Sequence, residues 1–107
     1  MAFRIVMVKF IENITDKQIT DFKDWLDELA LNTPYLINMN CGRHLTLDKE
    51  HSLDVVSPNA SFHDFVSMWE FEDESDLEKF IAEPFHREMA AAQFKKYVVH
   101  RHVVNIV

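Results

Sequence analysis

The residues best suited to chemistry lie in one stretch of the chain, from Trp69 to His86. Within it, a Glu-Pro-Phe-His segment at 83–86 follows a run of residues typical of a short helix. Proline lacks an N–H and clashes inside a helix but suits the first helical position, so Pro84 predicts the start of a second helix. His86 would then lie in the first turn of that helix, where the dipole favours a neutral imidazole. Such an imidazole in an apolar setting can act as a general base.

Composition excludes several other kinds of site. Gly42 is the only glycine, whereas a P-loop, a dinucleotide-binding turn and a nucleophile elbow all require glycines. Cys41 is the only cysteine, so neither an internal disulfide nor a cysteine-based zinc site is expected. Chemistry must therefore come from His, Arg, Asp, Glu and Tyr, and we expect no nucleotide or other cofactor.

Arg4 and a pair of histidines are further candidates. Arg4 falls on the side of the first strand that should face the helices, where a guanidinium is costly unless paired. We therefore expect a carboxylate partner or an anionic ligand for it. His100 and His102 place two imidazoles on one face of the last strand, and such a pair can bind a metal. No carboxylate at a matching spacing completes the set, so we expect no metal site.

Length and charge define the class of protein. A chain of 107 residues predicts a single domain over 1–107. The formal net charge of −7 argues against nucleic-acid binding, which requires clustered Lys and Arg. The sequence has no apolar stretch long enough to span a bilayer and no signal segment at its start. We therefore expect a soluble, cytoplasmic protein that binds neither nucleic acid nor membrane.

The hydrophobic pattern predicts alternating strands and helices. Thr15 is expected to cap the first helix and Ser75 the second, and Gly42 to stop the second strand near its end. The polar segment 45–61 is expected to be a loop, mobile or lying over the rim of a pocket. The predicted elements are strand 3–10, helix 16–31, strand 36–44, strand 62–71, helix 75–83, helix 84–95 and strand 97–107.

This order is β-α-β-β-α-β, the split βαβ of the α+β, ferredoxin-like fold. Helices would cover one face of the antiparallel sheet. In the first strand, however, Phe3, Ile5 and Met7 point away from the helices and are also apolar. A second subunit would cover that face, together with Val66 and Met68 of the third strand, so we expect a homodimer.

The first strand, the Trp-Glu-Phe strand end and the 83–86 turn resemble the stress-responsive dimeric α/β-barrel (Dabb) family. The resemblance covers nearly the whole chain outside 45–61, and it implies that two sheets close into a barrel in the dimer. Olivetolic acid cyclase, a plant polyketide cyclase of this family, works without metal or cofactor. The resemblance places its histidine general base at His86. Phe80 stands where that enzyme has a tyrosine and Arg4 where it has a histidine, while Glu83 replaces a histidine frequent in the family. These departures argue against the same cyclisation.

Three functions are compatible with these residues. The first is a cofactor-free enzyme (a cyclase, lyase or isomerase) acting on an aromatic or polyketide-like molecule, with His86 as base and Arg4 stabilising an oxyanion. The second is a protein that binds a small apolar ligand, and the third a stress-response protein that acts as a stable assembly. In each case we expect one set of side chains to line the space between the helices and the sheet. These side chains belong mainly to the hydrophobic core and also form the pocket wall: Val6, Val8, Phe22, Leu26, Trp69, Phe80, Ile81 and Met89.

Overall fold

The computed structural model describes residues 1–44 and 63–107. Its elements are β1 (Ala2–Phe10), α1 (Asp16–Leu31), β2 (Leu36–Arg43), β3 (Phe65–Phe71), α2 (Glu74–Ala82), α3 (Pro84–Tyr97) and β4 (Val98–Ile106). The loop predicted at 45–61 lies outside the described residues. In the ranges that are described, no helix is long and apolar enough to cross a membrane.

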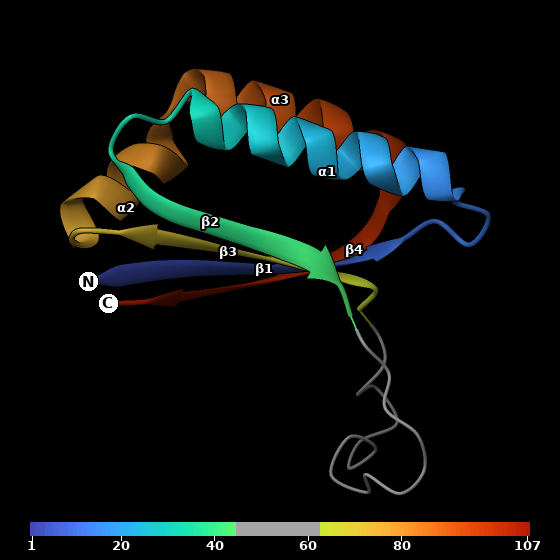
Figure 1. Cartoon of the computed structure of the whole chain (residues 1–107), viewed down its shortest axis with the longest axis horizontal. Helices are drawn as coiled ribbons and strands as arrows, with labels where there is room; N and C mark the ends of the chain where they lie inside the picture. Colours follow the sequence, from blue (N-terminus) through green and yellow to red (C-terminus); the bar gives the residue numbers. More distant parts are fainter. Residues whose placement is uncertain (45–62) are drawn as a thin grey trace, which may run out of the picture.

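The strands form one antiparallel sheet in the order β2-β3-β1-β4. All the helices lie on one face of it, with α1 and α3 running together across the sheet and α2 at one end (Figure 1). This arrangement confirms the predicted ferredoxin-like α+β fold. It leaves the opposite face of the sheet without a covering layer from the described helices.

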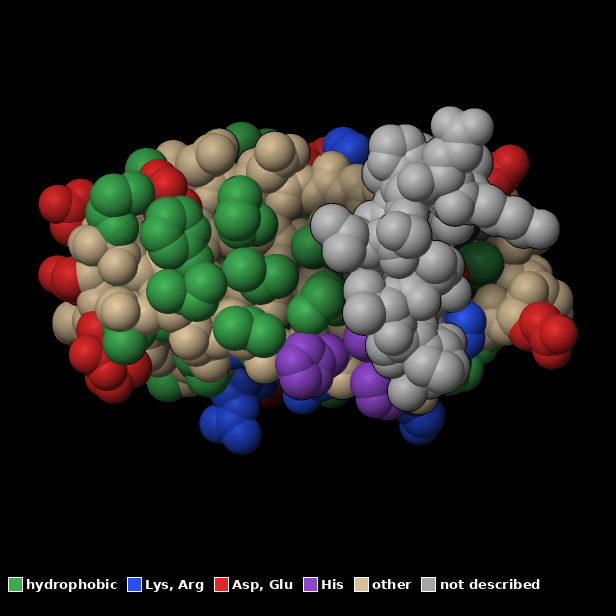
Figure 2. Space-filling model, turned by 90° about the horizontal axis from the view of Figure 1, so that it is seen from below, with side chains coloured by type: hydrophobic (Ala, Val, Ile, Leu, Met, Phe, Trp, Pro, Cys, Tyr) green, Lys and Arg blue, Asp and Glu red, His purple; other side chains and the backbone are tan. Residues whose placement is uncertain are grey.

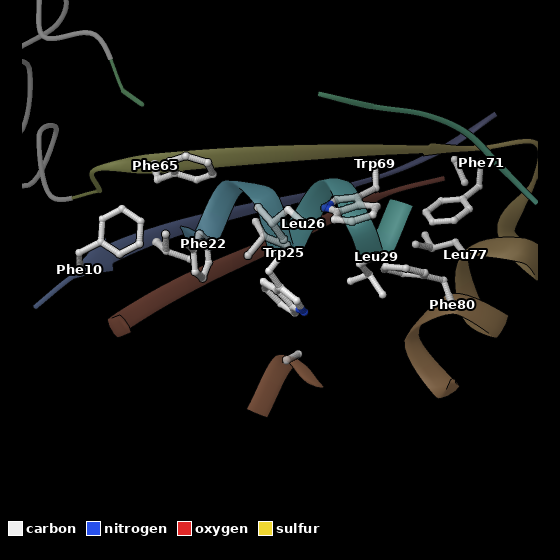
Figure 3. Close-up of a cluster of buried hydrophobic side chains, with 14 residues drawn as sticks. Phe10, Phe22, Trp25, Leu26, Leu29, Phe65, Trp69, Phe71, Leu77 and Phe80 are labelled. Carbon is white, nitrogen blue, oxygen red and sulfur yellow. The ribbon is translucent and has the colours of Figure 1, made fainter. Parts of the chain in front are cut away.

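The central strand β1 alternates as predicted. Val6, Val8 and Phe10 are buried beneath the helices, whereas the side chains between them, on the other face, are only partly buried. Phe10 and Phe65 pack against Phe22 of α1 with ring centroids 5.3 and 5.6 Å apart (Figure 3). Each fully buried aromatic side chain contributes roughly 2 kcal/mol to stability. The sheet and α1 therefore share one aromatic core.

Helix α1 has the predicted boundaries because its start is capped twice. The Thr15 hydroxyl accepts a hydrogen bond from the backbone N–H of Gln18, and the Gln18 side chain accepts one from the backbone N–H of Thr15. This capping box satisfies two N–H groups that a helix start leaves unpaired. The buried side of the helix then carries Phe22, Trp25, Leu26 and Leu29.

Other boundaries differ from the predictions. Helix α2 starts one residue early because Asp73, rather than Ser75, is its N-cap and accepts a hydrogen bond from the Asp76 N–H. Strand β2 continues through Gly42 instead of stopping there, and β3 begins at Phe65. Helix α3 extends two residues beyond its predicted end, to Tyr97. Its predicted start at Pro84 is confirmed.

Capping by Asp73 is testable by truncation. Replacing Asp73 with Ala should lower the free energy of unfolding by about 1 kcal/mol, because the Asp76 N–H loses its acceptor. Replacing the exposed Ser75 with Ala is the matched control and should change stability by less than about 0.5 kcal/mol. Urea denaturation of both variants measures the difference. If Ser75→Ala lost more free energy of unfolding than Asp73→Ala, Ser75 would be the capping residue.

Candidate functional site

A cavity of about 470 Å³ lies between the sheet and the helices. Its size is that of a site for a small organic molecule. Most of the wall is apolar or aromatic, and the polar groups are a serine, a histidine and arginines. The lining residues are Arg4, Val6, Val8, Phe22, Trp25, Leu26, Leu29, Phe65, Ser67, Trp69, Phe80, Ile81, His86, Arg87, Ala90, Ala91, Phe94 and Arg101.

The structure brings nearly all of the predicted site residues together around this cavity. His86 and Arg4, from opposite ends of the sequence, both line it. So do the predicted wall residues, Val6, Val8, Phe22, Leu26, Trp69, Phe80 and Ile81. Met89 does not, since it is partly buried against the hydrophobic core elsewhere on α3.

Pro84 explains the position of His86. In an unbroken helix, the N–H of residue 84 would bond to the carbonyl of Phe80, but proline has no N–H to give. The Phe80 carbonyl instead accepts the Glu83 N–H at 3.3 Å and lies 3.0 Å from His86 Nδ1. The imidazole also stacks on the Phe80 ring, with centroids 4.1 Å apart. At the helix break, the histidine ring is thus held by a hydrogen bond at its edge and by stacking on its face.

This hydrogen bond selects the tautomer of His86. A carbonyl oxygen only accepts, so Nδ1 carries the proton and donates it to Phe80. In the neutral ring, Nε2 then keeps its lone pair as an acceptor. The arrangement leaves His86 with one basic nitrogen that this bond does not use.

The surroundings of His86 also favour its neutral form. Burial lowers the pKa of the imidazole below its ordinary value of 6.5, and the nearby positive charges of Arg4 and Arg101 lower it further. The hydrogen bond to the Phe80 carbonyl and the charge of Glu83 act in the opposite direction without reversing the shift. At neutral pH, His86 is therefore an unprotonated base.

The sequence predicts either a carboxylate partner or an anionic ligand for Arg4, and in the described residues its side-chain partner is a neutral amide. Its Nη1 donates a hydrogen bond to Oδ1 of Asn105, at 3.1 Å, across the β1–β4 pair. Burial lowers the pKa of Arg4, and the charge of Arg101 lowers it further. The guanidinium is thus held in place beside the cavity by an amide that does not neutralise it.

Arg101 and Arg87 are site residues that the sequence analysis missed. Arg101 pairs with Val8, so it projects on the helix-covered face of β4, and its guanidinium carbon lies 5.2 Å from the Phe94 ring centroid. The alternation of side chains along the strand contained the signal, because Arg101 must lie on the face opposite to that of the neighbouring histidines.

Ser67 was also missed. It is buried, and its hydroxyl accepts a hydrogen bond from Trp69 Nε1 at 3.0 Å.

A second hollow shares three residues, Leu29, Phe80 and His86, with the cavity. The stacked rings of Phe80 and His86 therefore lie between the two hollows. The second hollow, unlike the cavity, has acidic side chains in its lining, and its other lining residues are Glu28, Asn32, Thr33, Pro34, Tyr35, Lys79 and Glu83. Glu83, which raises the pKa of His86, is one of these acidic residues.

The histidine pair of β4 lies on the opposite face of the sheet. His102 pairs with Met7 and His100 with Lys9, and His63 Nε2 lies 3.2 Å from His100 Nδ1. Figure 2 shows histidines on this face next to a large apolar surface. Among the residues that the structure describes, no group of three or more His, Cys, Asp or Glu side chains could hold a metal ion.

Solved structures with the same fold were found in several organisms. The Arabidopsis thaliana protein At3g17210 is 13% identical, with a TM-score of 0.81 over 100% of this chain and 94% of its own. The hydroxynitrile lyase from Passiflora edulis is 17% identical, with a TM-score of 0.77 over 98% and 90%. A dimeric ferredoxin-like protein of unknown function from Thermobifida fusca is 20% identical, with a TM-score of 0.73 over 99% and 89%.

Sequence comparison assigns the family directly. A search of curated proteins finds no match to this sequence. The family model described as the stress responsive A/B barrel domain, Dabb, matches residues 2–107. That match extends over all the described elements, from β1 to β4. The chain therefore belongs to the Dabb family.

Proposed function

We propose that this protein is a cofactor-independent enzyme that acts on an aromatic or polyketide-like small molecule by proton transfer through His86. The observation that carries the proposal is the Nδ1–H bond to the Phe80 carbonyl, which leaves Nε2 of a neutral imidazole as the acceptor at a largely apolar cavity. A base with these properties is matched to proton abstraction near neutral pH.

The proposed reaction begins with transfer of a proton from a carbon next to a carbonyl group to Nε2 of His86. The electron pair of the broken C–H bond moves into the carbonyl, which becomes an enolate oxyanion. The Arg4 guanidinium stabilises that negative charge or anchors a carboxylate of the same substrate, and the apolar wall strengthens either interaction by excluding water. His86 then returns its proton to the product or the leaving group, in a cyclase, lyase or isomerase type of reaction.

The hydroxynitrile lyase from Passiflora edulis supports an enzymatic role, because it shows that this fold can carry catalysis. At 17% identity, the comparison shows only that the two proteins have the same fold. The alternative is a non-catalytic protein that binds a small apolar ligand or acts as a stress-response dimer. We also propose a cytoplasmic location, since a single cysteine suits a reducing compartment.

Removing the base tests the proposal. His86→Ala should lower turnover of an aromatic or polyketide-like substrate by about a hundredfold or more, the usual scale for loss of a general base. His44→Ala replaces a histidine outside the cavity and should leave turnover unchanged. Steady-state kinetics after a screen of such compounds provide the measurement. If the screen finds no binder and His86→Ala changes no property, the assembly function replaces the catalytic one.

The lowered pKa of His86 predicts a pH dependence with a definite sign. The unfolded chain binds a proton near pH 6.5, but the folded chain does so only at lower pH. His86 should thus cost no stability above pH 6.5, and the free energy of unfolding should fall as pH falls from there through the folded-state pKa. The difference between wild type and His86→Gln in denaturation at each pH isolates this group. If wild type instead gained stability relative to His86→Gln as the pH fell, His86 would not be a buried neutral imidazole.

We further propose that the protein is a homodimer joined through the uncovered face of the sheet. Phe3, Ile5 and Met7 of β1 lie on this face with Val66 and Met68 of β3, and Met68 is 40% exposed. Figure 2 shows the apolar side chains gathered there. The Thermobifida fusca protein of the same fold is described as dimeric. A second copy would bury a patch that water disfavours.

A charge at the centre of this face tests the dimer. Ile5→Asp should dissociate it, because the interface would have to bury an unpaired carboxylate. Thr20→Asp, on the exposed side of α1, adds the same charge elsewhere and should remain dimeric. Sedimentation at micromolar concentration gives the mass, while circular dichroism reports whether the variant is folded. A monomeric wild type would contradict the proposal.

A further inference from the structure

We propose that Arg4 and Arg101 form an anion-binding subsite that holds the carboxylate of an organic acid whose apolar body fills the rest of the cavity. This inference names the substrate class for the proposed function and rests on it for the reaction. Binding of an acid at these arginines can nevertheless be measured without turnover.

The charge of the cavity differs sharply from that of the protein. The chain has 18 acidic residues against 11 Lys and Arg, yet the cavity lining includes Arg4, Arg87, Arg101 and His86 and no Asp or Glu. In the described part of the chain, the ion pairs use Lys9, Lys17, Lys23 and Arg43. The cavity arginines take part in none of these pairs. Although the protein is acidic, none of these ion pairs neutralises the positive charges that line its cavity.

Each of the two arginines is positioned by a contact that leaves its charge in place. Arg4 donates to the neutral amide oxygen of Asn105, and Arg101 lies over the face of Phe94. They come from adjacent antiparallel strands and project on the same face of the sheet. Both line the same cavity, and the charge of Arg101 lowers the pKa of Arg4. An anion that contacts both would offset the repulsion of their charges.

The rest of the wall indicates what carries the anion. Aromatic and aliphatic side chains make up most of the lining, including Trp25, Phe65 and Phe94. A free inorganic anion would leave that apolar surface in contact with water, whereas an aromatic acid would cover it. The guanidinium fork matches a carboxylate in two parallel hydrogen bonds. An acid of this kind would also extend toward His86, which lines the same cavity.

Paired probes of equal shape test the subsite. The full-length protein is titrated calorimetrically at pH 7 with cinnamate and 3-phenylpropionate, and with the neutral amide of each. We expect each acid to bind at least tenfold more tightly than its amide, as charge-assisted hydrogen bonds imply. Arg4→Met and Arg101→Met should each weaken acid binding about tenfold or more and leave amide binding unchanged. Arg43→Met removes the same charge outside the cavity and should change neither.

Several results would overturn the subsite. They are equal affinity for acid and amide, no binding of either acid below roughly 1 mM, and competition by inorganic phosphate as effective as that by cinnamate. Melting temperature gives a readout that separates binding from structure. Without ligand, Arg101→Met should melt near the wild-type temperature, because the contact with the Phe94 ring and the repulsion of Arg4 are lost together. A melting temperature lowered by more than about 5 °C would mark Arg101 as structural and contradict the proposal.

His86→Ala separates this inference from the proposed function. If the variant loses turnover while acid and amide bind wild type equally, the enzyme stands and the subsite fails. If acids bind selectively through Arg4 and Arg101 but wild type turns over no screened compound, the subsite stands and the proposed enzymatic function fails. Selective binding that persists in His86→Ala, with turnover lost, supports both.

Discussion

The candidate site depends on one hydrogen-bond acceptor, the carbonyl oxygen of Phe80. Pro84 cannot supply the N–H that this carbonyl would receive in a continuous helix, so the oxygen is available to His86. A buried carbonyl without a partner would be costly, and the imidazole helps to satisfy it. The same bond fixes the tautomer of the ring. Helix geometry, side-chain position and the basic nitrogen therefore follow from a single missing backbone donor.

Much of this could be predicted from the sequence because it depends on local chemistry. The proline restart, the Thr15 cap and the alternation in β1 are properties of short segments, and the structure confirms each of them. Ser75 failed as a cap because several neighbouring residues could cap the same helix. Asp73 competed successfully, and its side chain accepts the Asp76 N–H. Local patterns identify a helix start more reliably than the residue that caps it.

The electrostatics of the cavity required information that no short segment carries. Arg101 reaches the site through the register of β4 against β1, a pairing of residues more than ninety positions apart along the chain. The partner of Arg4 was likewise set by register, which placed Asn105 opposite it instead of an acidic residue. Sequence reasoning could state that a half-buried guanidinium needs a partner. Only the assembled sheet could identify that partner as a neutral amide.

Strand β1 connects the two faces of the molecule. Val6 and Val8 face the cavity, and Ile5 and Met7 face the uncovered side of the sheet. A partner packed on that side would therefore press on the strand that carries Arg4. Because protein interiors transmit small displacements, the position of the guanidinium would depend on that packing. A second copy on that face would thus do more than cover apolar surface, since it would hold rigid the strand from which one wall of the cavity is built.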